Sequence, residues 1–242
     1  MAAGGWWSVS NGTSNVSKLT QEEKPALKER KAVQTGQNPK DLLTYVWIPP
    51  GAFRMGCSNG DKECFDDEKP ARDVTIDHGF WIGQTEVTQA AYKLVMGADP
   101  SSFKGADLPV ETVSWDEADK YCHAIGGNLP TEEQWEYAAR AGNQEARYGP
   151  VDKVAWYAGN SGLKTHPVRG KDANALGIYD MLGNVWEWTD SWSGSGKTSR
   201  VLRGGSWVNQ SRLARVSHRF VNHPSVRGLN VGFRCSGEKL VP

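Results

Sequence analysis

Two capped helices constrain this chain more than any other feature of its sequence. SWDEADKYCHAIGG begins at Ser114, carries Glu117 three residues later in a capping box, and stops at Gly126. LPTEEQWEYAARAG repeats the pattern from Thr131, and TQAAYKLVMG is a third helical stretch after Thr88. The remaining sequence holds only short alternating pieces that are typical of strands. The sequence therefore predicts an α+β domain rather than a helical bundle.

Glycine and tryptophan are abundant, with 27 Gly and 11 Trp among 242 residues. They favour tightly turned, irregular structure that is held by large aromatic side chains. We expect one domain over residues 42–242. Residues 1–41 are polar and lack a hydrophobic period, so they are predicted to form a flexible N-terminal arm.

The formal net charge is zero, which argues against a dedicated nucleic-acid binder. No apolar stretch approaches the length that a membrane-spanning helix needs. The first residues lack the basic and apolar regions of a signal peptide. Membrane anchoring through an N-terminal signal or lipid that this sequence does not carry stays open.

The four cysteines do not follow a zinc-binding pattern, since there is no CxxC pair and no histidine at a ligand spacing. Cys122 lies on the apolar face of its helix, and Cys57 and Cys64 are close enough in sequence to pair. Disulfides would indicate an extracytoplasmic protein, whereas buried reduced thiols would fit the cytoplasm. Both interpretations remain at this point.

One family shares, in the same order, the motifs IPPGAFRMGC, WIGQTEVTQAAY, LPVETVSWDEADKYC, GGNLPTEEQWEYAARAG, YDMLGNVWEWTDSW, VLRGGSW and NVGFRC. Together they resemble the formylglycine-generating-enzyme (sulfatase-modifying factor) domain over most of the chain. The resemblance implies that family's variant of the C-type lectin fold, with a small antiparallel sheet, two flanking helices and long ordered loops. It also implies a disulfide between Cys122 and Cys235.

The resemblance argues against the enzyme's own activity. In the family, two thiols that bind copper follow the RGGS motif, and the matching positions here are Asn209 and Ala214. Neither can supply the thiolate that Cu(I) needs, so we expect no enzyme. An enzyme with altered, thiol-independent chemistry is the alternative, with His218 or His223 as its base. These histidines have no neighbouring carboxylate in sequence, and the simpler interpretation places them exposed in a loop.

No cofactor is expected, and calcium is the one alternative. Asn160, Asn184 and Glu187 are calcium candidates by resemblance to some relatives, although their spacing excludes an EF-hand loop. In the alternative interpretation, Asn184 caps a turn and Glu187 makes a buried hydrogen bond beside Trp186 and Trp188.

The stretch from Val208 to Arg234 has an unusual composition. Of Gln, Lys, Glu, Met and Trp, it contains only Gln210. This resembles the variable proteins of diversity-generating retroelements, including those of treponemes, which display a hypervariable region on a C-type lectin scaffold. Their targeted codons become NNY, which encodes none of those five residue types. A basic loop that lacks them by chance is the other interpretation.

This second resemblance implies a non-enzymatic, cell-surface or secreted protein that binds an unknown protein or surface ligand through residues 208–230, the C-terminal segment. Leu213, His218, Phe220, Val221, His223 and Leu229 are expected to project into solvent, with Trp207 and Phe233 in the core. The candidate contact residues are Val208, Asn209, Ser211, Arg212, Leu213, His218, Phe220, Val221, Asn222, His223, Ser225, Val226, Gly228, Leu229 and Asn230.

Three arginines of this region are assigned to the rigid structure around the contact residues. We expect Arg215, Arg219 and Arg234 to pair with carboxylates such as Glu136 or Glu187.

Overall fold

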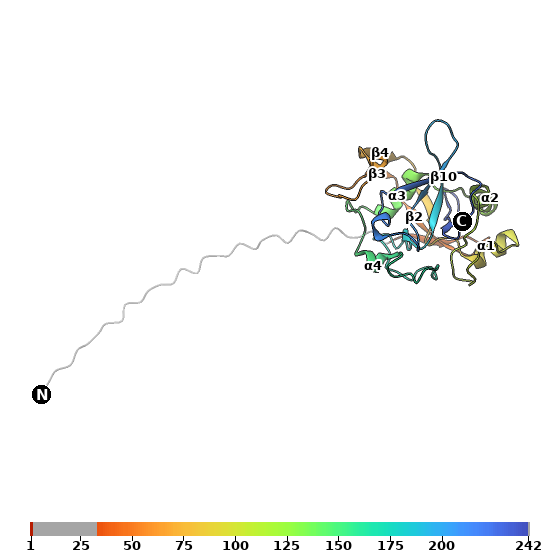
Figure 1. Cartoon of the computed structure of the whole chain (residues 1–242), viewed down its shortest axis with the longest axis horizontal. Helices are drawn as coiled ribbons and strands as arrows, with labels where there is room; N and C mark the ends of the chain where they lie inside the picture. The colour runs from red at the N-terminus through yellow and green to blue at the C-terminus, as the bar shows by residue number, and fades with distance from the viewer. Residues whose placement is uncertain (2–32, 242) are drawn as a thin grey trace. The chain divides into compact units, whose positions relative to one another are not determined.

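The fold is described from a computed structural model, in which residue 1 and residues 33–241 are placed. The predicted flexible arm falls largely on residues 2–32, which lie outside the described residues. Two four-stranded sheets form the centre of the domain, with the strand orders β1-β2-β5-β12 and β10-β9-β8-β11 (Figure 1).

The first sheet is antiparallel throughout. Its strands are β1 (Thr35–Gln37), β2 (Thr44–Ile48), β5 (Phe80–Gly83) and β12 (Ser236–Gly237). A separate antiparallel pair, β3 (Gly51–Met55) with β4 (Arg72–Ile76), follows β2 after Pro49 and Pro50.

The second sheet carries most of the C-terminal region. Its strands are β8 (Trp186–Trp192), β9 (Arg200–Arg203), β10 (Arg219–Asn222) and β11 (Val231–Gly232). The pair β11–β8 is parallel, as is the small pair of β6 (Ala155–Trp156) with β7 (Leu182–Gly183). The antiparallel sheet that the family resemblance implies is present, and long connections allow these two pairs of two-residue contacts to form in parallel beside it.

All three predicted helices are confirmed. They are α1 (Gln89–Met96), α2 (Trp115–Ile125) and α3 (Glu132–Arg140); shorter turns are α4 (Val151–Val154), η1 (Asp66–Glu68) and η2 (Ser211–Leu213). Both capping boxes form, with Ser114 accepting from the Glu117 amide and Thr131 from the Gln134 amide. Gly126 ends α2 at a φ of 97°, in the left-handed region that favours glycine.

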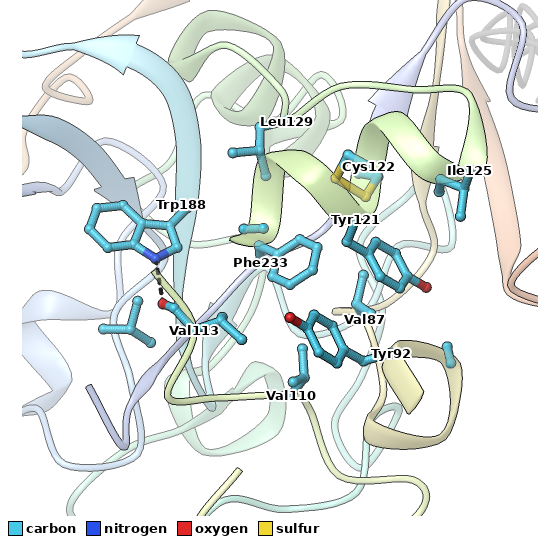
Figure 2. Packing of buried hydrophobic residues seen from close by; sticks show 14 of the residues in the cluster. Val87, Tyr92, Val110, Val113, Tyr121, Cys122, Ile125, Leu129, Trp188 and Phe233 are labelled. Atoms are coloured by element: carbon cyan, nitrogen blue, oxygen red, sulfur yellow. Dashed lines mark hydrogen bonds between the residues drawn. A yellow bond between two sulfur atoms is a disulfide. The ribbon is translucent and has the colours of Figure 1, made fainter. Parts of the chain in front are cut away.

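The core contains the expected disulfide between Cys122 and Cys235, which is confirmed and buried (Figure 2). Phe233 packs beside it against the rings of Tyr92 and Tyr121. Trp207 is buried as well, at the edge of the C-terminal segment. Both aromatic residues therefore lie where the sequence places them.

The predicted domain boundary at residue 42 is wrong. Strand β1 pairs with β2 and joins the folded domain. Asn38 is buried and donates to the carbonyl oxygens of Ile125 and Leu240, while Asp41 accepts from the hydroxyls of Tyr45 and Tyr121. Three of these four contacts come from residues 80 or more positions away in sequence, so the local polarity of residues 33–41 gave no sign of them.

Candidate ligand-binding surface

Arg203, at the end of β9, fixes the backbone of the C-terminal segment through hydrogen bonds to its carbonyl oxygens. Its guanidinium donates to the carbonyl oxygens of Val216 (2.9 Å), Ser217 (2.8 Å) and His218 (3.1 Å), and it pairs with Glu136. Arg203 and Glu136 are both buried. One charged pair therefore fixes three successive peptide groups of the segment.

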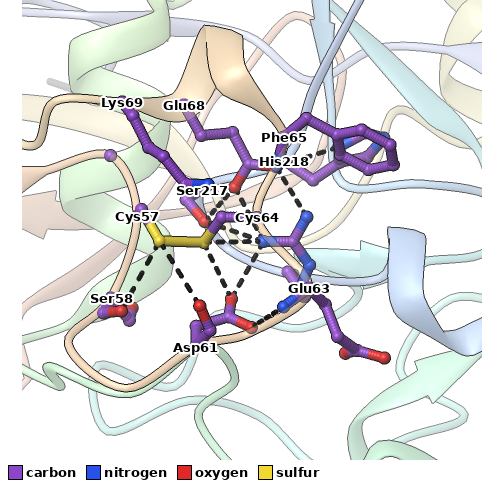
Figure 3. The surroundings of a disulfide bond; sticks show 12 residues. Cys57, Ser58, Asp61, Glu63, Cys64, Phe65, Glu68, Lys69, Ser217 and His218 are labelled. Carbon is purple, nitrogen blue, oxygen red and sulfur yellow. Dashed lines mark hydrogen bonds and ion pairs between the residues drawn. A yellow bond between two sulfur atoms is a disulfide. The ribbon is translucent and has the colours of Figure 1, made fainter.

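A loop closed by the Cys57–Cys64 disulfide lies against the same part of the segment (Figure 3). We refer to residues 57–68 as the disulfide loop. Arg215 of the segment makes two parallel hydrogen bonds to Glu68 (2.6 and 2.7 Å) and a third to Asp61 (2.9 Å). The pairing of Cys57 with Cys64, which the sequence left open, thus places two acidic partners for Arg215.

Burial alone would raise the pKa of the Glu68 carboxyl. Contacts with His218, Arg215 and Ser217 outweigh that effect and hold its pKa well below the usual range. Glu68 is therefore a carboxylate at neutral pH, as its ion pair with Arg215 requires.

Arg147 makes a further connection between the loop and the segment. Its guanidinium donates to the carbonyl oxygens of Ser211 and Ala214 (both 2.9 Å) and to Glu63 of the disulfide loop (3.0 Å). Residues 211–218 are thus held by arginines from three different parts of the chain.

The distal half of the segment is fixed by main-chain hydrogen bonds to the stretch before α2. The amide of Trp115 donates to the Pro224 carbonyl (2.9 Å), and the amide of Thr112 to that of Gly228 (3.0 Å). Arg227 pairs with Glu117 on the helix itself. The segment therefore has an ordered backbone along its length.

The side chains of the segment nevertheless face outward to an unusual degree. Val208, Phe220, Val221 and Leu229 are 44%, 45%, 39% and 49% exposed, respectively. Of the fifteen candidate contact residues, the exposed ones are Val208, Arg212, Phe220, Val221, His223, Ser225 and Leu229. The half-buried ones are Asn209, Ser211, Leu213, Asn222, Val226, Gly228 and Asn230. Four of the nine large apolar side chains that are exposed among the described residues therefore belong to this one segment.

His218 corrects the sequence-based expectation, because it is buried rather than projecting into solvent. Its ring lies between Phe65 (5.1 Å between centroids) and Trp186 (5.5 Å), and Trp186 in turn supports the exposed ring of Phe220 (5.5 Å). His218 directly precedes β10, and its burial by two aromatic rings from distant parts of the chain could not be predicted from a loop interpretation. Leu213 is also only half-exposed.

The positions that match the family's thiols have structural roles here. Asn209 accepts a hydrogen bond from the Ser206 hydroxyl (2.6 Å), which also accepts from the Asn230 amide (3.1 Å). Ala214 is buried in the core. All four cysteines of the chain are paired in the two disulfides, so none is a free thiol.

The arginine partners are partly as expected. Arg234 pairs with Glu187 at 2.7 Å, which confirms that assignment. Arg219 pairs with Glu132 and Arg215 with Glu68, two carboxylates that the sequence did not single out. The acidic composition of the disulfide loop was the available signal, because an arginine-rich segment without acids needs partners elsewhere.

The three calcium candidates are engaged in protein contacts. Asn160 accepts from the Tyr157 amide, and Asn184 donates to Glu86 (2.6 Å). Glu187 accepts from Trp135 and Arg234, so the expected buried hydrogen bond of Glu187 is present. Across residues 33–241, no three His, Cys, Asp or Glu side chains gather as metal ligands would.

A buried acidic cluster lies behind this site and was missed from the sequence. Glu86, Asp180 and Glu187 surround the single guanidinium of Arg234. Burial raises the pKa of Asp180 to about 6, against the opposing effects of the Arg169 amide and Arg234. Burial, with the charges of Asp180 and Glu187, also holds the pKa of Glu86 well above its usual range.

The surface of the segment is open rather than hollow. The nearest cavity, of about 140 Å³, is lined from the segment by Ser217 and Arg219, alongside Glu132, Glu136 and Arg203. Five of its charged lining residues are engaged in the ion pairs described above, namely Glu68, Glu132, Glu136, Arg203 and Arg219. The exposed apolar side chains of the segment do not line this cavity.

The fold and the motif order define a protein of the formylglycine-generating-enzyme type. The family model "Sulfatase-modifying factor enzyme 1-like domain" matches residues 31–239. The chain belongs to this family.

The chain is similar both to a relative that is named as inactive and to one that is named as an enzyme. The mouse protein named "Inactive C-alpha-formylglycine-generating enzyme 2" is 35% identical over 62% of this chain and 56% of its own length. The mouse "Formylglycine-generating enzyme" is 28% identical over 85% of this chain and 78% of its own length.

Two solved structures share the fold. PvdO from Pseudomonas aeruginosa has a TM-score of 0.78 at 26% identity and covers 86% of this chain and 99% of its own. Treponema denticola variable protein 1 has a TM-score of 0.75 at 27% identity and covers 86% and 100%. The expected C-type lectin fold, in the variant of this family, is thereby confirmed.

The two disulfides are typical of a secreted or otherwise extracytoplasmic protein. Within the described residues, no helix combines the length and the apolar character that a bilayer crossing requires.

Proposed function

We propose that this chain is a non-enzymatic ligand-binding protein whose C-terminal segment is the contact surface. One observation carries the proposal: four large apolar side chains are exposed on a backbone that buried arginines hold in place. A fixed backbone reduces the ordering entropy lost on binding, and exposed apolar groups supply contact energy.

The surface fits an unidentified protein or surface ligand. Phe220 supplies an aromatic anchor supported by Trp186, while Arg212, His223 and Ser225 supply polar contacts around it. Diversification by a retroelement belongs to the same proposal. It is supported by the codon-restricted composition and by the likeness to the Treponema denticola variable protein.

The enzymatic alternative has less support. The resemblance places Asn209 and Ala214 at the thiol positions, and both disulfides consume the remaining cysteines. We predict that the pure protein leaves the cysteine of a CxPxR peptide unmodified and does not bind Cu(I) tightly. Mass spectrometry that detects formylglycine in the peptide would contradict this.

A panning experiment tests the binding role. A phage-displayed random peptide library is selected on the immobilised protein, and the recovered clones are measured against Phe220→Ser/Leu229→Ser. Leu94→Ser/Leu163→Ser is the matched control, because both leucines are exposed outside the segment. We expect binding to weaken at least tenfold with the first pair and to be unchanged with the second. Clones that lose affinity equally for both variants, or for neither, would refute the assignment.

A further inference from the structure

The two disulfides differ in how exposed their cysteines are to a reductant in solution. Cys122 and Cys235 are completely buried. Cys57 and Cys64 are only half-buried, and Cys57 lines a surface cavity of about 330 Å³ with Arg54, Asn59 and Gln144. A small thiol or an exposed protein thiol can therefore approach the Cys57 sulfur without unfolding the domain.

The disulfide loop reaches the proposed contact surface through its own side chains. Phe65 packs against the ring of His218 (Figure 3). Asp61 accepts a hydrogen bond from Arg215. Glu63 accepts one from Arg147, whose guanidinium also donates to the carbonyl oxygens of Ser211 and Ala214. Two of these three residues, Asp61 and Glu63, lie between the bridged cysteines. Their positions thus depend on the closure of the loop.

We propose that the Cys57–Cys64 bond is a reducible latch that controls the order of residues 211–218, and thereby the contact surface assigned under the proposed function. When the bond is intact, the loop presents Asp61 and Phe65 to the segment. When it is reduced, the loop is free to move away while the buried Cys122–Cys235 disulfide keeps the core assembled.

The chemistry is thiol–disulfide exchange with a dithiol reductant. One thiolate of the reductant attacks the Cys57 sulfur through the cavity, the sulfur–sulfur bond breaks, and its electron pair leaves on Cys64. The leaving sulfur lies 3.6 Å from the Arg215 guanidinium, which stabilises a thiolate, and it then takes a proton from water. The second thiol of the reductant closes its own disulfide and releases Cys57 as a thiol.

Reduction of the Cys57–Cys64 bond should first weaken main-chain hydrogen bonds of residues 211–218. The amide of Val216 donates to the Ala146 carbonyl (2.9 Å), and the amide of His218 to that of Arg215 (3.2 Å). Both bonds lie beside Arg215. They therefore report on the latch without any ligand.

The native protein is titrated with dithiothreitol, alkylated with iodoacetamide and mapped by mass spectrometry, and amide hydrogen exchange is measured on the same samples. We expect Cys57 and Cys64 to be alkylated while Cys122 and Cys235 stay bonded. Exchange at Val216 and His218 should accelerate at least tenfold, and exchange at the core amide of Gly83 should not change.

Cys57→Ser/Cys64→Ser should show the accelerated exchange without reductant and no further change with it, which makes it the matched control. Alkylation of all four cysteines together, or selective reduction with unchanged exchange at Val216 and His218, would overturn the proposal. Because no ligand is used, failure of the latch leaves the peptide-panning result standing, and failure of the panning leaves the latch standing.

Discussion

At the scale of single residues, burial separates the contact surface from its support. Val221 and Leu229 are exposed, whereas Trp207 and Phe233 are buried at either end of the same region. The indole of Trp207 donates to the Leu229 carbonyl at 3.3 Å, so the support touches the backbone and leaves the Leu229 side chain outside. The two sets should respond to substitution in opposite ways.

We predict that Val221→Ser and Leu229→Ser each change the free energy of unfolding by no more than about 0.5 kcal/mol. Phe220→Ser should cost about 1 kcal/mol, because its ring rests on Trp186. Trp207→Ala and Phe233→Ala should each cost about 3–5 kcal/mol. Urea denaturation of the five variants checks this, and losses of several kcal/mol at Val221 and Leu229 would place the segment in the core.

The buried carboxyl of Asp180 gives a second prediction at this scale. Its pKa is about 6 in the folded state, above its ordinary value of 3.8. Between about pH 4 and pH 6 the folded state therefore binds more protons than the unfolded state, and stability falls as the pH rises. Asp180→Asn removes this dependence, and asparagine tolerates the local φ of 56°.

We expect the stability of Asp180→Asn to rise relative to the wild type from pH 4 to pH 7, and the difference to level off above that. Denaturant unfolding of both proteins across this range measures it. Parallel curves would show that Asp180 does not titrate in this window.

At the scale of elements, the helices were predictable and the segment was not. Capping boxes and terminal glycines are local signals, and they located α1, α2 and α3. The buried position of His218 depends on contacts with Phe65 and with Glu68, which is 150 residues earlier in sequence. Such a contact leaves no periodic trace in the sequence.

The same limit applies to the support of the segment. The motif RGGSW indicated a rigid start, but only the structure connects Arg203 to the carbonyl oxygens of residues 216–218. Arg203→Met should leave the carbonyl oxygens of residues 216–218 without their buried donor, at a cost of about 1–3 kcal/mol. Glu136 keeps its buried ion pair with Arg140 in this variant. A loss below about 1 kcal/mol in a chemical denaturation series would show that Arg203 does not hold the segment.

At the scale of the whole molecule, the two disulfides have different roles. We assign the stability of the fold to Cys122–Cys235 and the order of residues 211–218 to Cys57–Cys64. Cys122 and Cys235 are separated by 113 residues, and a bond that closes so long a loop stabilises by roughly 4–5 kcal/mol in the chain-entropy model. Cys122→Ala/Cys235→Ala should therefore lower the thermal midpoint far more than Cys57→Ser/Cys64→Ser does. Differential scanning calorimetry compares them, and equal shifts would contradict this division of roles.

The central claim is that a fixed scaffold presents a diversified contact surface, and sequencing the genomic locus that encodes the chain tests it most directly. We predict a near-copy of codons 203–235 beside a reverse-transcriptase gene, with differences confined to adenines of the copy. Those differences should fall on codons for exposed or half-buried residues such as Phe220, Val221 and Leu229, and spare Arg203, Trp207 and Phe233. A locus without such a copy, or differences that fall on the buried residues, would contradict the account.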